Sequence, residues 1–180
     1  DKASTRHLNV GGQFNGPTYV TGAYNGKSTG RFANNNDRLG NSDAYAVQPT
    51  TIFVVGQIAV GSNHLVDGVA GRKLVGSTAA TWQLYAGNIN SIGTFDTSPH
   101  SFLGIFNGAA SKLYVDGGLI DTVDAGTQWL DGGYTQMNGQ ATQGDLSELL
   151  IYDSALSAAN LNKVGNYLAT KWGLTWTTAT

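Results

Sequence analysis

Residues 144–157 read Gly-Asp-Leu-Ser-Glu-Leu-Leu-Ile-Tyr-Asp-Ser-Ala-Leu-Ser and predict a strand, a tight corner and the start of a helix. Between Leu146 and Tyr152 almost every residue is apolar, β-branched or aromatic, and turn-forming residues bound the run at 144–145 and 153–154. A short, bounded apolar run of this kind is typical of a strand that is covered on both faces. We therefore expect a doubly covered strand at this place.

A helix is predicted to follow from about residue 157 to residue 172. Ser157 is a good N-cap because its hydroxyl accepts from the free N–H groups of the first turn. Apolar residues then recur at helical spacing and form one stripe: Leu161, Val164, Leu168 and Trp172. Leu156 and Leu161 occupy the two positions of a hydrophobic staple. Lys171 suits the negative end of the helix dipole, and Gly173 suits the left-handed residue that ends a helix.

The same segment, continued by Lys163-Val-Gly-Asn-Tyr-Leu-Ala-Thr-Lys-Trp-Gly-Leu174, resembles the closing segment of laminin-G-like, concanavalin A-like jelly-roll domains. Such domains occur in bacterial surface proteins and in phage structural proteins. Similar pieces occur upstream in the same order, at residues 30–32, 36–39, 51–55, 105–108 and 112–117, so the resemblance spans residues 28 to 174. It implies an all-β, antiparallel β-sandwich of the jelly-roll type with one C-terminal helix packed on it. It implies little about function, since this fold hosts lectins, hydrolases, lyases and structural modules.

The composition fits one domain with many turns. The chain has 180 residues, 25 of them Gly, only 12% charged residues and no Cys. Residues 1–27 carry few periodic apolar residues and predict an irregular N-terminal arm with one short strand at 18–20, while residues 28–180 predict the sandwich and its helix. A net charge of −2 offers no clustered cations for nucleic acid. No apolar run approaches the length of a membrane span.

The middle of the chain predicts an antiparallel meander. The strongest strand is expected at 51–60, with Ile52, Val54, Ile58 and Val60 on one face and Phe53 and Val55 on the other. Shorter strands are expected at 64–69, 73–75 and 81–85. A hairpin of 102–106 with 112–115 and a third strand at 119–123 complete the pattern.

An enzymatic function is the main alternative, because this fold also houses retaining glucanases. Their chemistry needs two carboxylates about 5 Å apart on one face. The sequence has a single glutamate, Glu148, and Asp145 lies three residues before it, so a regular strand would point them to opposite faces. Regular alternation also places Glu148 on the face of Leu146, Leu150 and Tyr152. We expect Glu148 to be structural, with Arg38 or backbone N–H groups as its partners.

The sequence contains only weak indications of a metal site. His7, His64 and His100 are scattered without ligand spacing, so zinc is not expected. Calcium remains a weaker candidate, because loop aspartates are its usual ligands and some laminin-G-like domains hold one; the residues concerned are Asp37, Asp67, Asp116 and Asp131. No other cofactor is expected.

Aromatic residues give the candidate ligand-binding positions. Trp129 and Tyr134 lie in a Gly-rich stretch, 126–139, and each either plugs the core or contacts a ligand. Trp82 and Tyr85 fall on opposite faces of one expected strand, so at most one of them is exposed.

The sequence therefore favours a non-catalytic recognition or structural module. The resemblance suggests an extracellular setting: a phage virion, as a decoration or tail-associated protein, or a bacterial surface, with a glycan or neighbouring subunits as partners. A homo-oligomer or virion lattice fits this setting. The alternative is a secreted carbohydrate-active enzyme, a glucanase or lyase, or its carbohydrate-binding module.

Overall fold

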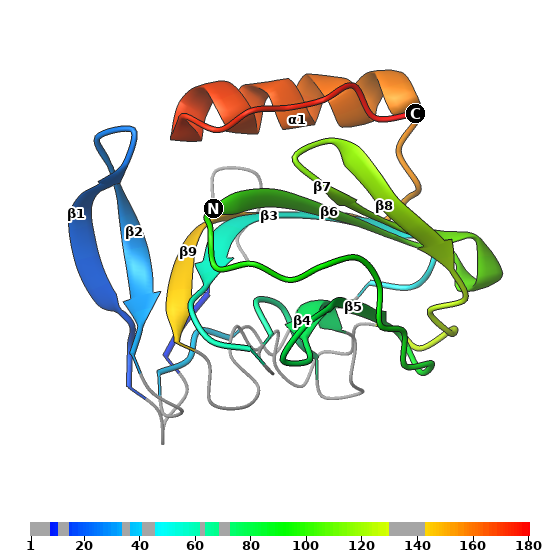
Figure 1. Cartoon of the computed structure of the whole chain (residues 1–180), viewed down its shortest axis with the longest axis horizontal. Coiled ribbons are helices and arrows are strands. Elements are labelled where there is room, and N and C mark those ends of the chain that lie inside the picture. The colour runs from blue at the N-terminus through cyan, green and yellow to red at the C-terminus, as the bar shows by residue number, and fades with distance from the viewer. Residues whose placement is uncertain are drawn as a thin grey trace.

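The computed structural model describes residues 8–10, 15–33, 37–40, 46–61, 64–68, 73–129 and 143–180, with only the backbone at 73–75. The predicted fold is confirmed: an antiparallel β-sandwich carries one C-terminal helix on its outer face (Figure 1). A large sheet forms the middle layer. A two-stranded sheet with its loops packs on one face, and the helix packs on the other.

Seven strands form the large sheet in the order β1-β2-β9-β3-β6-β7-β8, and all their pairings are antiparallel. Their bounds are β1 Thr18–Tyr24, β2 Lys27–Phe32, β3 Thr50–Ile58, β6 His100–Phe106, β7 Ser111–Val115, β8 Gly118–Val123 and β9 Gly144–Tyr152. The small sheet pairs β4 (Lys73–Ser77) with β5 (Trp82–Tyr85). The last strand in sequence therefore lies between the second and the third.

A β-bulge at Ser147 changes the faces predicted for β9. Opposite β3, Val55 pairs with Glu148 but Gly56 pairs with Leu146, so Ser147 is the extra residue. The bulge moves Leu146 to the face of the small sheet, while Glu148, Leu150 and Tyr152 face the helix. Asp145 pairs with Gln57 and so shares the face of Glu148, and the predicted opposite placement of the two carboxylates is wrong. Regular alternation misplaces them because it assumes an uninterrupted ladder.

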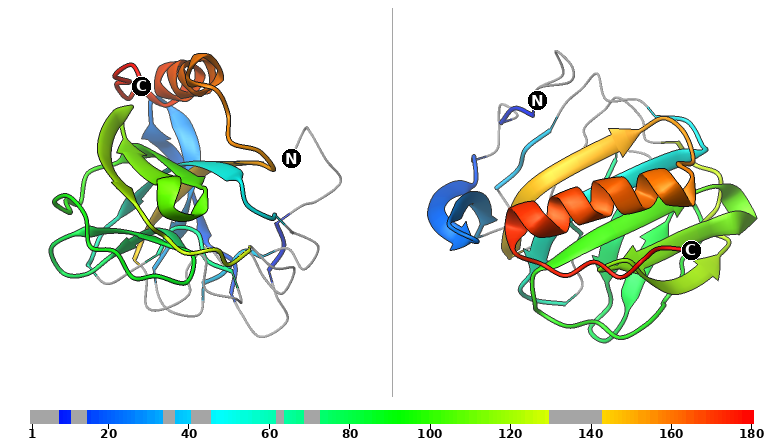
Figure 2. Two further views of the ribbon diagram at one scale, coloured as in Figure 1. Left: turned by 90° about the vertical axis from the view of Figure 1, so that its right-hand side faces the viewer. Right: turned by 90° about the horizontal axis from the view of Figure 1, so that it is seen from above.

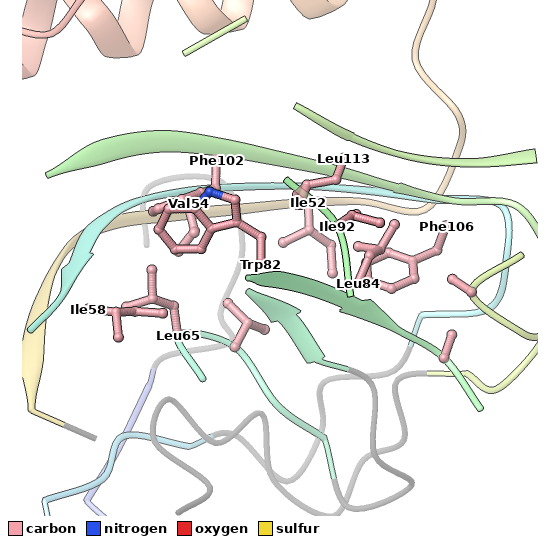
Figure 3. Packing of buried hydrophobic residues seen from close by; sticks show 13 residues of the cluster. Ile52, Val54, Ile58, Leu65, Trp82, Leu84, Ile92, Phe102, Phe106 and Leu113 are labelled. Atoms are coloured by element: carbon pink, nitrogen blue, oxygen red, sulfur yellow. The ribbon is translucent and has the colours of Figure 1, made fainter. Parts of the chain in front are cut away.

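Two hydrophobic cores lie on either side of the large sheet. Between the sheets, Trp82 is packed against Phe95, His100 and Phe102 with ring centroids 4.9, 5.9 and 5.2 Å away. Figure 3 shows Trp82 and Leu84 reaching from β5 toward Ile52 and Phe102 of the large sheet. Under the helix, Phe53, Val55 and Tyr114 meet the apolar stripe of the helix. The alternating faces predicted for β3 are confirmed from Ile52 to Ile58.

The C-terminal helix, α1 (Ala158–Trp172), matches its prediction closely. Ser157 caps it by accepting from Asn160 N at 3.4 Å, and Gly173 ends it with φ +70°. Leu161, Leu168 and Trp172 are buried as expected, whereas Val164 is only partly buried. Among the described residues, no helix combines the length and apolar character that a membrane crossing needs.

The segment after α1 folds back along it, as Figure 2 shows from above. Asn162 holds this return: its Oδ1 accepts from Trp176 Nε1 at 2.9 Å and from Ala179 N at 2.7 Å. Trp176 lies so close to Gly165 that a Cβ at this position would collide with the indole ring. The lack of a side chain at Gly165 therefore allows the returning segment to lie flat on the helix.

Three local predictions need correction, and one connection has additional structure. β3 ends at Ile58, where Ala59 N donates to Gln143 O at 2.8 Å, and Val60 is left exposed beyond it. The strand expected at 64–69 is reduced, in the described part, to isolated bridge residues at His64, which pairs with Gly76, and at Asp67. The strand expected at 18–20 extends to Tyr24, and a short 3₁₀ helix, η1 (Gly108–Ala110), occupies the β6–β7 connection.

Candidate functional site

Four segments meet at one end of the sandwich, and one of them ends with Trp129. They are residues 46–49 before β3, 86–90 after β5, 107–110 between β6 and β7, and 124–129 after β8. We call these segments the loop end. Figure 1 shows the yellow-green segment 124–129 at the right-hand end of the sheet, and the left view of Figure 2 looks onto this end.

The side chain of Gln48 joins three of the four segments. Its Nε2 donates to Gly126 O at 2.9 Å and to Gln128 O at 3.1 Å. Its Oε1 accepts from Gly108 N at 2.6 Å. All the hydrogen-bonding partners are backbone groups, so one partly buried amide fixes the path of the chain that leads to Trp129.

Backbone hydrogen bonds fasten segment 86–90 to segment 124–129. Ala86 N and Asn88 N both donate to Ala125 O, at 2.6 and 3.1 Å, and Gln128 N donates back to Ala86 O at 2.7 Å. Gly126 has φ +88°, and a Cβ there would collide with the Ala86 carbonyl. Glycine is therefore required for the close approach of the two segments. The backbone that precedes Trp129 is held from two sides.

Large apolar side chains are exposed on this rigid end. Trp129 is 50% exposed and Ile89 is 76% exposed, and Val47 is exposed beside Gln48. Burying an aromatic of this size against a partner removes a large apolar area from water. Tyr134, the second aromatic expected here, lies outside the described residues.

The other two aromatic candidates, Trp82 and Tyr85, lie on opposite faces of β5, as the sequence predicts. Trp82 is 2% exposed and belongs to the core between the sheets, so it is withdrawn as a ligand-binding residue. It is buried because its face of β5 points to the large sheet, as that of Leu84 does. Tyr85 points to the other face and is partly exposed, so it stays a candidate.

Glu148 has its partners on the helix. Lys171 Nζ lies 3.0 Å from Oε1, and Trp172 Nε1 donates to Oε2 at 2.6 Å. Burial alone lowers the pKa of Lys171, but hydrogen bonds to Glu148 and Tyr167 raise it above its ordinary value, so the ammonium stays charged. The expected partner, Arg38, lies instead in the segment that bridges to Asn15, where its backbone N donates to Asn15 O. The sequence signal that was overlooked is Lys171 and Trp172 at the end of the predicted stripe.

Asp145 is held by the β1–β2 hairpin. Arg31 donates to both carboxylate oxygens, from Nε at 2.7 Å and from Nη2 at 2.8 Å, and Tyr24 Oη donates at 2.8 Å. Burial and the hydrogen bond to Asp145 raise the pKa of the Tyr24 phenol above its ordinary value, so it remains a donor. The Asp145 side chain is only 2% exposed. Asp145 and Glu148 share a face, but each is engaged by donors beneath the hairpin or the helix, which suits a structural role.

The calcium candidates are separated. Asp37 accepts from Ala33 N at 2.7 Å, Asp67 accepts from Gly68 N at 3.0 Å, and Asp116 binds His100. Within the described ranges, no group of three acidic or His side chains could hold a metal ion. Asp131 lies outside these ranges.

A charged cluster around His100 was not predicted. The His100 ring lies between Asp116 Oδ2, 2.7 Å from Nδ1, and Asp96 Oδ1, 3.0 Å from Nε2. Burial alone lowers the pKa of His100, but the two carboxylates raise it above its ordinary value, so the imidazolium is favoured. The signal available in the sequence was only the Asp96–His100 spacing, since Asp116 reaches the ring through the β6–β7 pairing.

No protein-family model and no curated protein sequence matches this chain. Among solved structures, the binding domain of Paraclostridial Mosquitocidal Protein 1 is similar with a TM-score of 0.66 and 15% identity, over 96% of this chain and 51% of that chain. Trypanosoma rangeli sialidase in complex with the inhibitor DANA is similar with a TM-score of 0.55 and 13% identity, over 77% of this chain and 27% of that chain. The likeness is one of fold. The chain spans about a quarter to a half of the length of these structures.

Proposed function

We propose that this chain is a non-catalytic recognition module that binds a glycan at the loop end, with Trp129 as its main contact. The observation that carries the proposal is a half-exposed Trp on a backbone that Gln48 and the 86–90 segment hold in place. Sugar rings present C–H faces that stack on such a side chain. A contact residue that follows a fixed backbone segment loses less entropy on binding than one on a mobile segment.

The similar structures support this proposal only through their fold. One is named a binding domain, and the other is a sialidase in complex with an inhibitor. We place the module outside the cell, on a phage virion as a capsid decoration or tail-associated protein, or on a bacterial surface. Neighbouring copies or other subunits are its protein partners in that setting, and the resemblance of residues 144–174 to such domains is the support.

The alternative of a carbohydrate-active enzyme has one supporting feature, the shared face of Asp145 and Glu148. Catalysis on a glycosidic bond needs one carboxyl group to protonate the leaving oxygen and the other to attack or to activate water. Both groups here accept hydrogen bonds from the hairpin or the helix. This arrangement favours the non-catalytic function.

The test is a glycan array probed with the purified protein, followed by titration of the strongest hit. Trp129→Ala should weaken that binding about 5- to 150-fold, the range of 1–3 kcal/mol found for hot-spot truncations. The melting temperature should change little. Tyr19→Ala is the matched control, since Tyr19 is 73% exposed on β1, away from the loop end, and its loss should leave binding intact.

Two other outcomes would contradict the assignment of Trp129 as the main contact. Unfolding of Trp129→Ala without a specific binding defect would make Trp129 a core plug and would remove the site from this end of the molecule. Equal losses for Trp129→Ala and Tyr19→Ala would indicate a general effect of removing surface aromatics.

A further inference from the structure

The loop end is nearly free of charge, and this bears on the class of glycan that it can take. Asp124 is the one charged residue in segments 46–49, 86–90, 107–110 and 124–129. The described segments of the loop end therefore carry one acidic residue and no cation.

Three side chains that can carry a positive charge are engaged away from the loop end. Arg31 is paired with Asp145 at the β1–β2 hairpin, and Lys171 is paired with Glu148 at the end of α1. His100 is held between Asp96 and Asp116. These three cations face carboxylates of the chain itself, so each is already neutralised.

Apart from Asp124, the exposed polar side chains of the loop end are amides and hydroxyls. Asn88, Asn107 and Thr127 are exposed on three different segments of the loop end. An amide or a hydroxyl both donates and accepts, which matches a sugar hydroxyl that does the same. A ligand carboxylate instead prefers charged donors such as Arg or Lys.

Asp124 adds a repulsive element against an anionic ligand. Its Oδ1 accepts from Gly126 N at 2.9 Å, which holds the carboxylate against the turn that leads to Trp129, and the residue is exposed. Two like charges 4 Å apart repel by about 1 kcal/mol in bulk water and by more near a protein surface. Specificity of this kind is built as much from the repulsion of the wrong ligand as from contacts to the right one.

We infer that the loop end selects uncharged glycans and rejects their sialylated or uronic-acid-bearing counterparts. This inference rests on the proposed function, because it names the ligand class of the same site. The neutral sugar contributes C–H faces to Trp129 and hydroxyls to the amides. The acidic counterpart meets one fixed carboxylate and no cation from the four described segments.

The experiment uses an array that carries each core glycan in a neutral and an acidic form, such as lactose beside 3′-sialyllactose and a xylan oligosaccharide beside its glucuronic-acid-substituted form. The best pair is then titrated at low and at physiological salt. The neutral member should bind at least about tenfold more tightly, a difference of about 1.4 kcal/mol. Its affinity should be nearly independent of salt, since screening affects only charged contacts.

Two variants of the protein sharpen the test. Asp124→Asn keeps an acceptor for Gly126 N and removes the charge, so it should tighten binding of the acidic member and leave the neutral member within about twofold. Trp129→Ala should weaken both members together. Tighter or equal binding of the acidic member by the wild-type protein would overturn the selectivity while leaving glycan binding intact. Binding to no glycan of either kind would overturn the proposed function itself.

Discussion

Trp172 donates its indole N–H to Glu148 at 2.6 Å, and this contact joins the last turn of α1 to the bulged part of β9. Lys171 adds a charged hydrogen bond to the same carboxylate at 3.0 Å. The helix end is also held from the hairpin, where Asn25 Nδ2 donates to Thr170 O and Lys171 O. The C-terminal end of α1 is therefore a junction with the preceding strand β9 and with the β1–β2 hairpin, which is far away in sequence.

Glu148→Gln tests the structural role of this carboxylate. The amide oxygen can still accept a hydrogen bond, but the side chain loses the negative charge that attracts Lys171. Its NH₂ group would face a donor, either Lys171 or Trp172. The free energy of unfolding should fall by about 1–3 kcal/mol, the scale of a hydrogen bond to a charged group. Denaturant unfolding measures the loss, and glycan titration should show unchanged binding.

Asp153→Asn is the control for that variant, because it removes an exposed negative charge just beyond β9. It should change stability by little, as surface substitutions usually do. If the wild-type protein hydrolyses a β-glucan and Glu148→Gln abolishes this at unchanged stability, the non-catalytic function is wrong.

Leu168→Ala tests whether α1 is part of the fold. Leu168 is buried in the core under the helix, so its truncation should cost about 2–5 kcal/mol. Thr170→Ala, on the exposed side of the same helix, should cost far less. A chain that ends at Ser154 should aggregate or form a molten product, and cooperative unfolding of such a chain would show that the helix is dispensable.

Gln48→Glu tests the positioning of the segment that carries Trp129. The carboxylate still accepts from Gly108 N, but it cannot donate to Gly126 O or Gln128 O and would face both carbonyls. Stability should fall by about 1–3 kcal/mol, and glycan affinity should fall with it. Gln48→Glu removes a donor and adds a negative charge, so the control is a variant that adds a negative charge nearby and keeps Gln48.

Ala109→Asp supplies this control, since Ala109 is exposed on the loop end and has no polar side chain to lose. It should leave stability nearly unchanged. If Ala109→Asp and Gln48→Glu weaken a neutral glycan equally, the effect comes from charge and the positioning role of Gln48 is refuted.

The His100 cluster predicts a dependence of stability on pH. The pKa of His100 is raised in the folded protein, so its contribution is fully present below the unfolded value near 6.5 and is lost as pH rises through the folded value. Stability measured by chemical denaturation should therefore fall between mildly acidic and alkaline pH. The His100→Gln variant should lose about 1–3 kcal/mol at pH 6 and less at pH 9. Parallel pH profiles of the two proteins would contradict this assignment.

The sequence predicted the parts of the fold that depend on local patterns. Ser157 and Gly173 bound the helix as their capping chemistry requires, and the alternating apolar residues from Ile52 to Ile58 face two cores. The bulge at Ser147 escaped prediction, because an extra residue in a ladder depends on the partner strand and leaves no mark on one strand alone.

The candidate site was predictable only in its exposed aromatic. Trp129 stands out as a large side chain among glycines, but nothing in the sequence connects it to Gln48, which lies 80 residues before Gln128. Likewise, a partly apolar strand cannot show which of Trp82 and Tyr85 faces the other sheet. Contacts between distant segments determine both the position of Trp129 and the burial of Trp82, and the pattern within one segment carries no information about those contacts.

The position of β9 between β2 and β3 has a consequence for the way this protein is made. The large sheet cannot close until the ribosome has released residues 144–152, and the core under α1 must wait for residues 158–172. Strand pairings between such distant residues carry a high contact order and form slowly. Nascent chains that stop before β9 expose the edges of β2 and β3 together with apolar side chains that both cores will later cover. Synthesis should thus depend on chaperones that hold the incomplete sheet, and premature termination should yield aggregates in place of a smaller folded domain.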